Sequence, residues 1–174
     1  MKKQKPKGFT LIEVILYIAI MAIMGGVFFS YGWNIVSARI KSATVRETFE
    51  SAVLVSERLK RELRSATDID QEHSAFNESP GKIVFTTLDG EVTFESSGDK
   101  VSIKREGEEA QFLHSDFVRI RNFLLTRQIS GDDKIQYVGF SFTAEAYYPA
   151  AGERYEYQFS VPMRGGVEIR FHTD

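Results

Sequence analysis

The stretch Lys7-Gly8-Phe9-Thr10-Leu11-Ile12-Glu13-Val14 opens an almost uninterrupted apolar run that continues to Tyr31. An α-helix rises about 1.5 Å per residue, so a helix from Phe9 to Tyr31 is long enough to cross a hydrocarbon layer of about 30 Å. The sequence therefore predicts a membrane-spanning helix near the amino end of the chain. We expect the residues that follow it to form a head on this stem.

Glu13 is the exception in the apolar run. A carboxylate inside the membrane costs on the order of 2.5 kcal/mol unless it is paired or reaches the interface. One interpretation is that Glu13 reaches back to the lipid headgroups. The other is that a peptidase cuts after Gly8, because Phe9 would then carry a terminal ammonium four residues before Glu13 on the same helical face. Pairing of these charges, within a chain or between staggered neighbours, would make the burial of Glu13 favour assembly.

This stretch resembles the class III signal of type IV pilins and type II secretion pseudopilins. The features that match are a basic leader, a Gly-Phe junction, a Glu and the apolar helix that follows. The lysines of the leader are Lys2, Lys3, Lys5 and Lys7. The resemblance implies that a prepilin peptidase cuts after Gly8 and methylates Phe9, and that Glu13 is the assembly residue. It also implies as partners other pilins or pseudopilins, an inner-membrane platform protein and an assembly ATPase that acts through the platform.

The leader predicts the orientation of the chain in the membrane. Positively charged segments stay in the cytoplasm, so we expect a single pass through the cytoplasmic (inner) membrane with the amino end inside and the head outside. A secretory signal peptide is cut after its apolar stretch, whereas the candidate site here precedes it. The stem is therefore expected to stay attached to the head and to enter a pilus or pseudopilus.

Composition limits the size and the partners of the head. A chain of 174 residues leaves room for one head domain, and the absence of cysteine means that apolar packing must stabilise it. The net charge is −2, and it falls to −6 without the four leader lysines, with 18 basic against 24 acidic residues. Such a chain lacks the clustered basic residues that neutralise phosphates, so we expect no direct binding of nucleic acid.

Helical periodicity continues beyond the membrane segment. An apolar stripe at steps of three and four residues consists of Val45, Phe49, Ala52, Leu59, Leu63 and Ala66. Glu57 with Arg61, and Arg58 with Glu62, are expected to form ion pairs on the exposed face. Gly25 and Gly26 have two interpretations, which are close packing of helices through small residues and a soft point where the stem bends.

These patterns predict the domain organisation and the fold class. We expect a leader at 1–8, a transmembrane and filament-core helix at 9–31, an amphipathic second half of the stem at 32–67 and a β-rich head at 68–174. The segment 73–81 is polar and is interpreted as a linker. The fold class is α+β, with a long amino-terminal helix packed against an antiparallel β-sheet head, as in pilins.

The strands of the head are predicted from alternation of apolar and polar residues. Asp89-Gly90 indicates a hairpin between 82–88 and 91–96, and Gly98-Asp99 a second turn. The residues expected to alternate on later strands are Val118, Ile120 and Leu124, then Val138, Phe140, Phe142 and Ala144, then Tyr155, Tyr157, Phe159 and Val161, and finally Val167, Ile169 and Phe171. Pro162 indicates an edge strand, and Gly165-Gly166 a turn before the last strand.

No catalytic motif is present, so we expect a protein that is not an enzyme. His73, His114 and His172 are far apart and are interpreted as surface residues. No metal site is predicted, and two acidic groups are the weak candidates for calcium. They are Asp132 with Asp133, and the alternating Asp68, Asp70 and Glu72, which lack the Gly and Glu that an EF-hand loop requires.

Two further interpretations concern function. Tyr147, Tyr148 and Tyr155 surround a Pro149-Ala150-Ala151-Gly152 loop and form either a contact patch or the ends of core strands. Residues 58–66 and 157–164 resemble the J-type pseudopilin and the W-type minor pilin. The function expected is a minor pilin or pseudopilin of a type IV pilus-like or type II secretion filament. The alternative is a membrane-anchored β-domain that binds a ligand and never polymerises.

Overall fold

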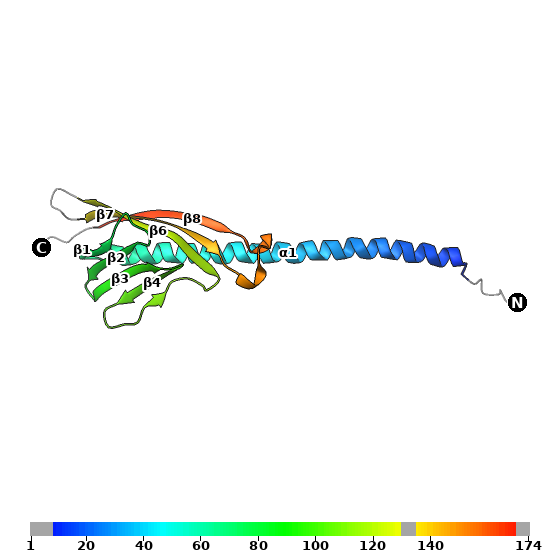
Figure 1. Cartoon of the computed structure of the whole chain (residues 1–174), viewed down its shortest axis with the longest axis horizontal. Helices are drawn as coiled ribbons and strands as arrows, with labels where there is room; N and C mark the ends of the chain where they lie inside the picture. Colours follow the sequence, from blue (N-terminus) through cyan, green and yellow to red (C-terminus); the bar gives the residue numbers. More distant parts are fainter. Residues whose placement is uncertain (1–8, 130–134, 170–174) are drawn as a thin grey trace, which may run out of the picture. The chain divides into compact units, whose positions relative to one another are not determined.

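The computed structural model of the chain describes residues 9–129 and 135–169. The helix α1 spans Leu11–Arg64, and its first half is long and apolar enough to cross a membrane. The residues form two compact units, one up to Ile40 and the other from Lys41 onward. The predicted fold class is confirmed, because a long amino-terminal helix packs against antiparallel sheets (Figure 1).

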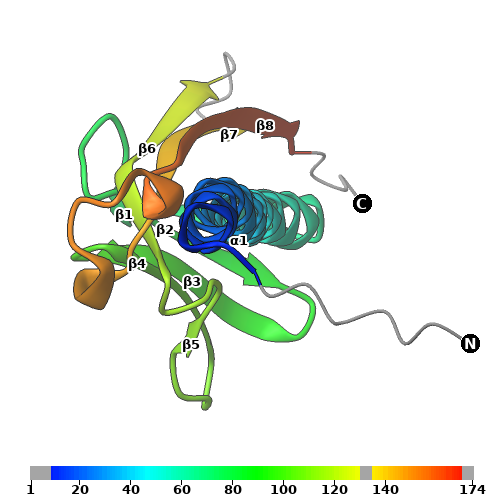
Figure 2. The same cartoon turned by 90° about the vertical axis from the view of Figure 1, so that its right-hand side faces the viewer.

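The second unit contains two antiparallel sheets, and its part of α1 lies between them (Figure 2). The first sheet has the order β1-β2-β3-β4-β5, and the second has the order β6-β7-β8. The strands of the first sheet are β1 Asp68–Ala75, β2 Lys82–Thr87, β3 Gly90–Ser97, β4 Lys100–Arg105 and β5 Gln111–Phe112. Those of the second are β6 Val118–Ile129, β7 Ile135–Ala146 and β8 Ser160–Glu168, and two short 3₁₀ turns, η1 Pro149–Ala151 and η2 Tyr155–Tyr157, lie between β7 and β8.

The buried stripe of α1 begins with hydroxyl side chains rather than with the apolar residues expected there. Phe49 was expected in the stripe, but this is wrong, since its side chain is 50% exposed. The buried positions on this part of the helix are Thr44 and Thr48, and Thr48 Oγ1 donates a hydrogen bond to the Thr44 carbonyl at 2.8 Å. This bond lets a hydroxyl face the head without an unsatisfied polar group. The fully buried residues that follow are Ala52, Val55, Leu59 and Leu63.

Of the two ion pairs predicted on α1, the pair of Arg58 with Glu62 is present and the pair of Glu57 with Arg61 is not. Arg58 pairs with Glu62 at 3.0 Å, but Glu62 is buried and also pairs with Arg105 Nη2 of β4 at 2.5 Å, so this pair does not lie on the exposed face. Glu57 pairs with Lys60 rather than with Arg61. A buried carboxylate needs compensating charge, which the two guanidinium groups supply.

Both predicted hairpins form, each with a two-residue turn, but the first turn lies one residue before the expected Asp89-Gly90. Thr87 of β2 lies opposite Gly90 of β3, so the turn is Leu88-Asp89, and Gly90 adopts a positive φ of 118°. Ser97 of β3 lies opposite Lys100 of β4 across Gly98-Asp99. The alternation in 138–144 is also confirmed, because all four apolar residues named there are buried.

The prediction that Leu124 shares a face with Val118 and Ile120 is wrong. Asn122 has a φ of 54°, and the register between β6 and β7 shifts between Arg121 and Leu124. A residue inserted at such a bulge moves every later side chain to the opposite face of the strand. Phe123 and Leu125 are therefore buried instead.

The prediction of a linker at 73–81 is wrong in its first part, because β1 continues to Ala75 and pairs with Lys82. Its one buried apolar residue is Ile69, so the strand has no alternating pattern that a sequence reading could detect. Asp70 makes β1 irregular, since its carboxylate accepts hydrogen bonds from the backbone N–H groups of Glu72 and His73.

Two predictions about the last strand are wrong. Tyr155–Tyr157 forms the turn η2 and not a strand, because the Gln158 N–H donates to the Tyr155 carbonyl and Lys41 Nζ donates to the carbonyls of both residues. Gly165-Gly166 is not a turn but lies inside β8, opposite Phe140 and Gly139. The aromatic side chains of β7 fill the space where a Cβ would stand, and this close approach explains the two glycines. The prediction of an edge strand at Pro162 is confirmed, since β8 is the last strand of its sheet.

Candidate functional site

The carboxylate of Glu13 lies in the first turn of α1, where it interacts with Thr10. The Thr10 N–H donates to Glu13 Oε2 at 3.5 Å, and the Glu13 N–H donates to Thr10 Oγ1 at 3.4 Å. These two long hydrogen bonds form a capping box, in which each residue satisfies a backbone N–H that the first turn leaves free. Thr10 was not identified from the sequence as a functional residue, although the spacing Thr-x-x-Glu is the signature of this motif.

The helix that follows presents its apolar side chains outward. From Leu11 to Val36 every large apolar residue is exposed, and Tyr31 and Trp33 are exposed as well. Monomeric soluble proteins rarely expose an apolar surface of this size, so lipid or neighbouring helices are the surroundings that suit this helix. Glu13 is only half-buried.

Phe9 and Glu13 are both among the described residues, whereas Gly8 and the leader lie outside them. The Phe9 side chain is 73% exposed, and its ring lies edge-on to Tyr17 with the centroids 6.1 Å apart. The pairing of a freed Phe9 ammonium with Glu13 stays a prediction.

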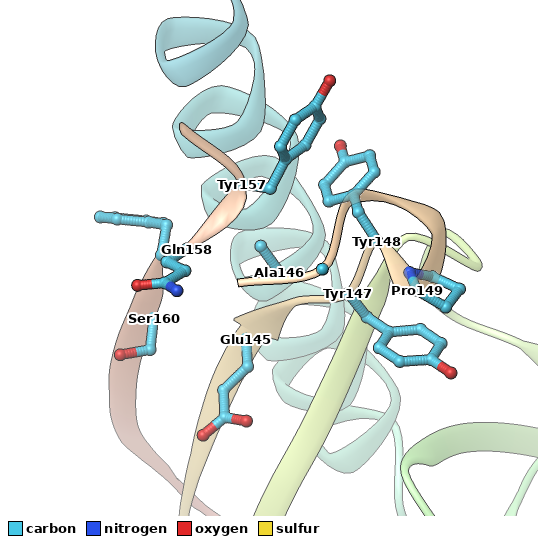
Figure 3. A pocket seen from close by; sticks show the side chains of 10 residues that line it. Glu145, Ala146, Tyr147, Tyr148, Pro149, Tyr157, Gln158 and Ser160 are labelled. Carbon is cyan, nitrogen blue, oxygen red and sulfur yellow. The ribbon is translucent and has the colours of Figure 1, made fainter. Parts of the chain in front are cut away.

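A second surface feature is the segment between β7 and β8. A pocket of about 620 Å³ is lined by aromatic and polar residues of this segment. Tyr148 and Tyr157 lie with their rings near α1, and Tyr147 points away from them (Figure 3). The Tyr148 hydroxyl donates to Glu47 at 2.8 Å, and burial together with this carboxylate raises the pKa of Tyr148 to about 12.

The three tyrosines predicted as a patch therefore differ in role. Tyr147 and Tyr148 are half-buried, and Tyr147 stacks against the guanidinium of Arg119, 3.2 Å from the ring centroid. Tyr155 is 62% exposed. Glu47 of α1 therefore holds the Tyr148 ring, and Arg119 of β6 holds the Tyr147 ring. These contacts cannot be recognised from the sequence around the tyrosines, because the partners lie far away along the chain.

The histidines also differ from one another. His73 is exposed and pairs with Asp70 at 2.7 Å. His114 is not the surface residue that was expected, because it is half-buried, accepts a hydrogen bond from the Val101 N–H at Nε2 and interacts with the Ser115 carbonyl through Nδ1. Burial lowers the pKa of His114, which favours the neutral ring that this geometry needs. His172 lies outside the described residues.

Within residues 9–129 and 135–169, no group of three or more His, Asp or Glu side chains is placed to hold a metal ion. Asp132 and Asp133, the weak candidates for calcium, lie outside these ranges. The Asp70 carboxylate already accepts hydrogen bonds from its neighbours. The backbone N–H and the ring of His73 hold the pKa of the Asp70 carboxyl below its usual value.

Together, these features define an α+β protein whose exposed apolar stem helix begins with a capped acidic residue. The model of the prokaryotic N-terminal methylation motif matches residues 3–29 of the chain. Searches of curated proteins and of solved structures gave no match. The match includes three of the four leader lysines, Gly8, Phe9 and Glu13, and it supports a type IV pilin-like or pseudopilin chain with a membrane-anchoring helix.

Proposed function

We propose that this protein is a non-enzymatic structural subunit, a minor pilin or pseudopilin, of a type IV pilus-like or type II secretion filament. The observation that supports the proposal most is the methylation motif at the start of an exposed apolar helix whose later turns pack on antiparallel sheets. In this role the prepilin peptidase cuts after Gly8 and methylates Phe9. The stem then passes from the cytoplasmic membrane into the filament core.

The subtype we favour is the J-type pseudopilin or the W-type minor pilin. The resemblance of residues 58–66 and 157–164 supports this assignment. The absence of cysteine also favours a minor subunit, because many major pilins close a carboxy-terminal loop with a disulfide, which this chain cannot form.

The assembly step uses Glu13. In the chain before cleavage its carboxylate caps the helix with Thr10. Cleavage adds an ammonium group at Phe9, one residue before the cap, so that the carboxylate gains a partner of opposite charge in its own or a neighbouring chain. The partners would be other pilins and the inner-membrane platform protein, with the assembly ATPase acting through the platform.

Mass spectrometry of the protein extracted from membranes tests this function. We expect a mass that lacks the first eight residues and includes one additional methyl group. An intact leader would instead favour the alternative, a membrane-anchored binding module that does not polymerise.

Two variants test the individual steps. Gly8→Ala is expected to block cleavage, so that the leader stays on the chain. Glu13→Ala is expected to leave membrane insertion intact and to weaken incorporation into filaments, measured by shearing and by co-purification with other subunits. Incorporation of Glu13→Ala at the native level would contradict the pairing mechanism.

A further inference from the structure

We propose that the free edge of β8 is a docking site for the acidic loop of a second copy of this chain. The acidic loop consists of residues 106–112, which comprise the turn after β4 and the short strand β5. The inference rests on the proposed function, in which subunits stand side by side, and it deepens that function by naming a contact between their heads. Both surfaces belong to the unit that begins at Lys41.

β8 is the last strand of its sheet, so one of its edges is free to pair with a further strand. The pairing with β7 has no break in register, and the Ile169 N–H donates to the Gln136 carbonyl of β7 at 2.8 Å. Because inward and outward groups alternate along an antiparallel ladder, the even-numbered residues of β8 direct their backbone groups away from β7. These residues are Ser160, Pro162, Arg164, Gly166 and Glu168. Such a row of backbone groups can bind an extended segment of another chain.

The side chains beside this edge include two arginines that are not compensated. A groove of about 420 Å³ is lined by Arg64 of α1 and by Gly166, Val167 and Glu168 of β8. Arg64 and Arg164 are exposed, and neither forms an ion pair with another residue that the structure describes. Lys60 also lies against β8, but its charge is compensated by Glu57. Charges on an edge strand prevent indiscriminate strand pairing, so the two arginines select a segment of opposite charge.

The acidic loop has the complementary charge and an exposed position. All of its residues are exposed, and Glu108 and Glu109 form no ion pair within the described part of the chain. β5 is the last strand of its sheet and pairs only with β4, so its outer edge is also open. Phe112, which is 60% exposed, adds an apolar side chain at the end of the loop. Figure 2 shows β5 and the turn before it projecting beyond the other strands, where they can reach a groove on another molecule.

The acidic loop and the β8 edge lie on different sides of the head (Figures 1 and 2). A contact between the loop of one chain and the β8 edge of the next is therefore heterologous, and it leaves each pair with one free surface of each kind. Contacts of this type form open rows of subunits rather than closed dimers, as a filament requires. Exposed ion pairs are individually weak, so we expect the contact to form between subunits that are already held close together and to weaken at high salt.

The absence of cysteine allows the contact to be tested by cross-linking of the full-length chain. Ala110→Cys places a thiol in the acidic loop, and Pro162→Cys places one at an exposed position of β8. The variants are produced in cells, singly, together in one chain, and as a mixture of the two single variants, and the membranes are treated with a short bismaleimide. The mass of the chain in the same membranes reports whether the leader was removed, and so tests the proposed function separately.

We expect a ladder of dimers, trimers and longer products from the double variant, dimers alone from the mixture, and no product from either single variant. A cross-linked dimer in a single variant would show a two-fold contact and would overturn the inference. Absence of the ladder would also overturn it, and the proposed function would stand if the leader had been removed. A ladder from chains with an intact leader would support the contact and contradict the proposed function. Products that join the chain to a different protein, without the ladder, would overturn the second copy as the occupant.

Charge reversal identifies the groups responsible. In the double-cysteine chain, Glu108→Lys with Glu109→Lys should reduce the ladder several-fold, and Arg64→Glu with Arg164→Glu should do the same. All four substitutions together should restore the ladder, because opposite charges then face one another again. Glu153→Lys is the matched control and should leave the ladder unchanged, since Glu153 is also exposed but lies between β7 and β8. Circular dichroism checks that the variants are folded, and a folded chain with all four substitutions that gives no ladder would overturn the inference.

Discussion

The side chain of Thr10 gives the acidic residue Glu13 a hydrogen-bond partner within its own chain. Its hydroxyl accepts the Glu13 N–H, while the Glu13 carboxylate accepts the Thr10 N–H, so the carboxylate has a partner before any neighbour arrives. This lowers the cost of holding an ionisable group near the membrane. The spacing Thr-x-x-Glu, which is typical of a capping box, is present in the sequence at Thr10 and Glu13.

We predict that Thr10→Val weakens the start of α1 without preventing membrane insertion. Loss of an N-terminal capping hydroxyl costs about 1 kcal/mol of helix stability. Faster hydrogen exchange at the amides of the first turn, measured in detergent micelles, would check this. Thr10→Ser keeps the hydroxyl and should behave like the native protein. Equal exchange rates in the Val and Ser variants would contradict the role of the cap.

His114 makes the stability of the head depend on pH. Burial lowers the pKa of His114 below the ordinary value of 6.5. At acidic pH the unfolded chain therefore binds a proton at this histidine more strongly than the folded protein does. Stability is therefore expected to fall as the pH decreases through about 6.5. Lys100 lowers the pKa further and Asp116 opposes it. The pKa values of Asp70 and Asp116 are lowered from 3.8, so these carboxyls affect stability only at more acidic pH.

The measurement is the thermal unfolding midpoint of the full chain in detergent at about pH 5.5 and about pH 7.5. His114→Gln should reduce the difference between the two midpoints, because the amide oxygen can accept the Val101 N–H and does not titrate in this range. A native difference in His114→Gln would show that another group is responsible.

Among the elements, β8 depends on its two glycines to approach β7. A Cβ on Gly165 would lie 2.5 Å from Cζ of Phe140, a buried ring that cannot move away. A Cβ on Gly166 would meet the Tyr137 ring, which is partly exposed and can rotate into solvent. We expect Gly165→Ala to lower the free energy of unfolding by about 1–3 kcal/mol and Gly166→Ala to lower it less. Urea unfolding of the two variants would test the order, and a larger loss in Gly166→Ala would contradict it.

The elements that the sequence predicted well are those set by local rules. The Gly98-Asp99 hairpin follows turn preferences, and α1 follows helical periodicity. The first hairpin was also located, although its turn, Leu88-Asp89, lies one residue before the expected Asp89-Gly90. Some failures occur where a distant residue decides the conformation, and others where a local irregularity such as a bulge has no clear sequence signal. Lys41 binds the carbonyls that make Tyr155 a turn, the aromatic rings of β7 require glycines inside β8, and the bulge at Asn122 reverses the face of Leu124.

The whole molecule combines two units that suit different surroundings. The unit up to Ile40 has its large apolar side chains from Phe9 to Val36 exposed, while the core of the second unit consists of residues of α1 from Ala52 onward and of residues that follow the helix. Of the candidate site, the sequence identified Phe9 and Glu13, because a charged residue within an apolar run can be recognised from the sequence alone. It did not identify the contacts of Tyr155 with Lys41 and of Tyr148 with Glu47, because these join residues more than a hundred positions apart.

This division predicts that the head folds without the membrane segment. A chain that starts at Val36 keeps the buried positions Thr44 and Thr48 and every member of the hydrophobic core. It removes only residues whose apolar surface is not buried in the head, so no burial energy of the core is lost. We expect this fragment to be soluble without detergent and to unfold cooperatively near the temperature at which the head of the full chain unfolds, measured by circular dichroism. A fragment that starts at Leu59 lacks Ala52 and Val55 between the sheets and should not fold. If the longer fragment were also unfolded in the absence of detergent, the stability of the head would have to depend on the residues before Val36.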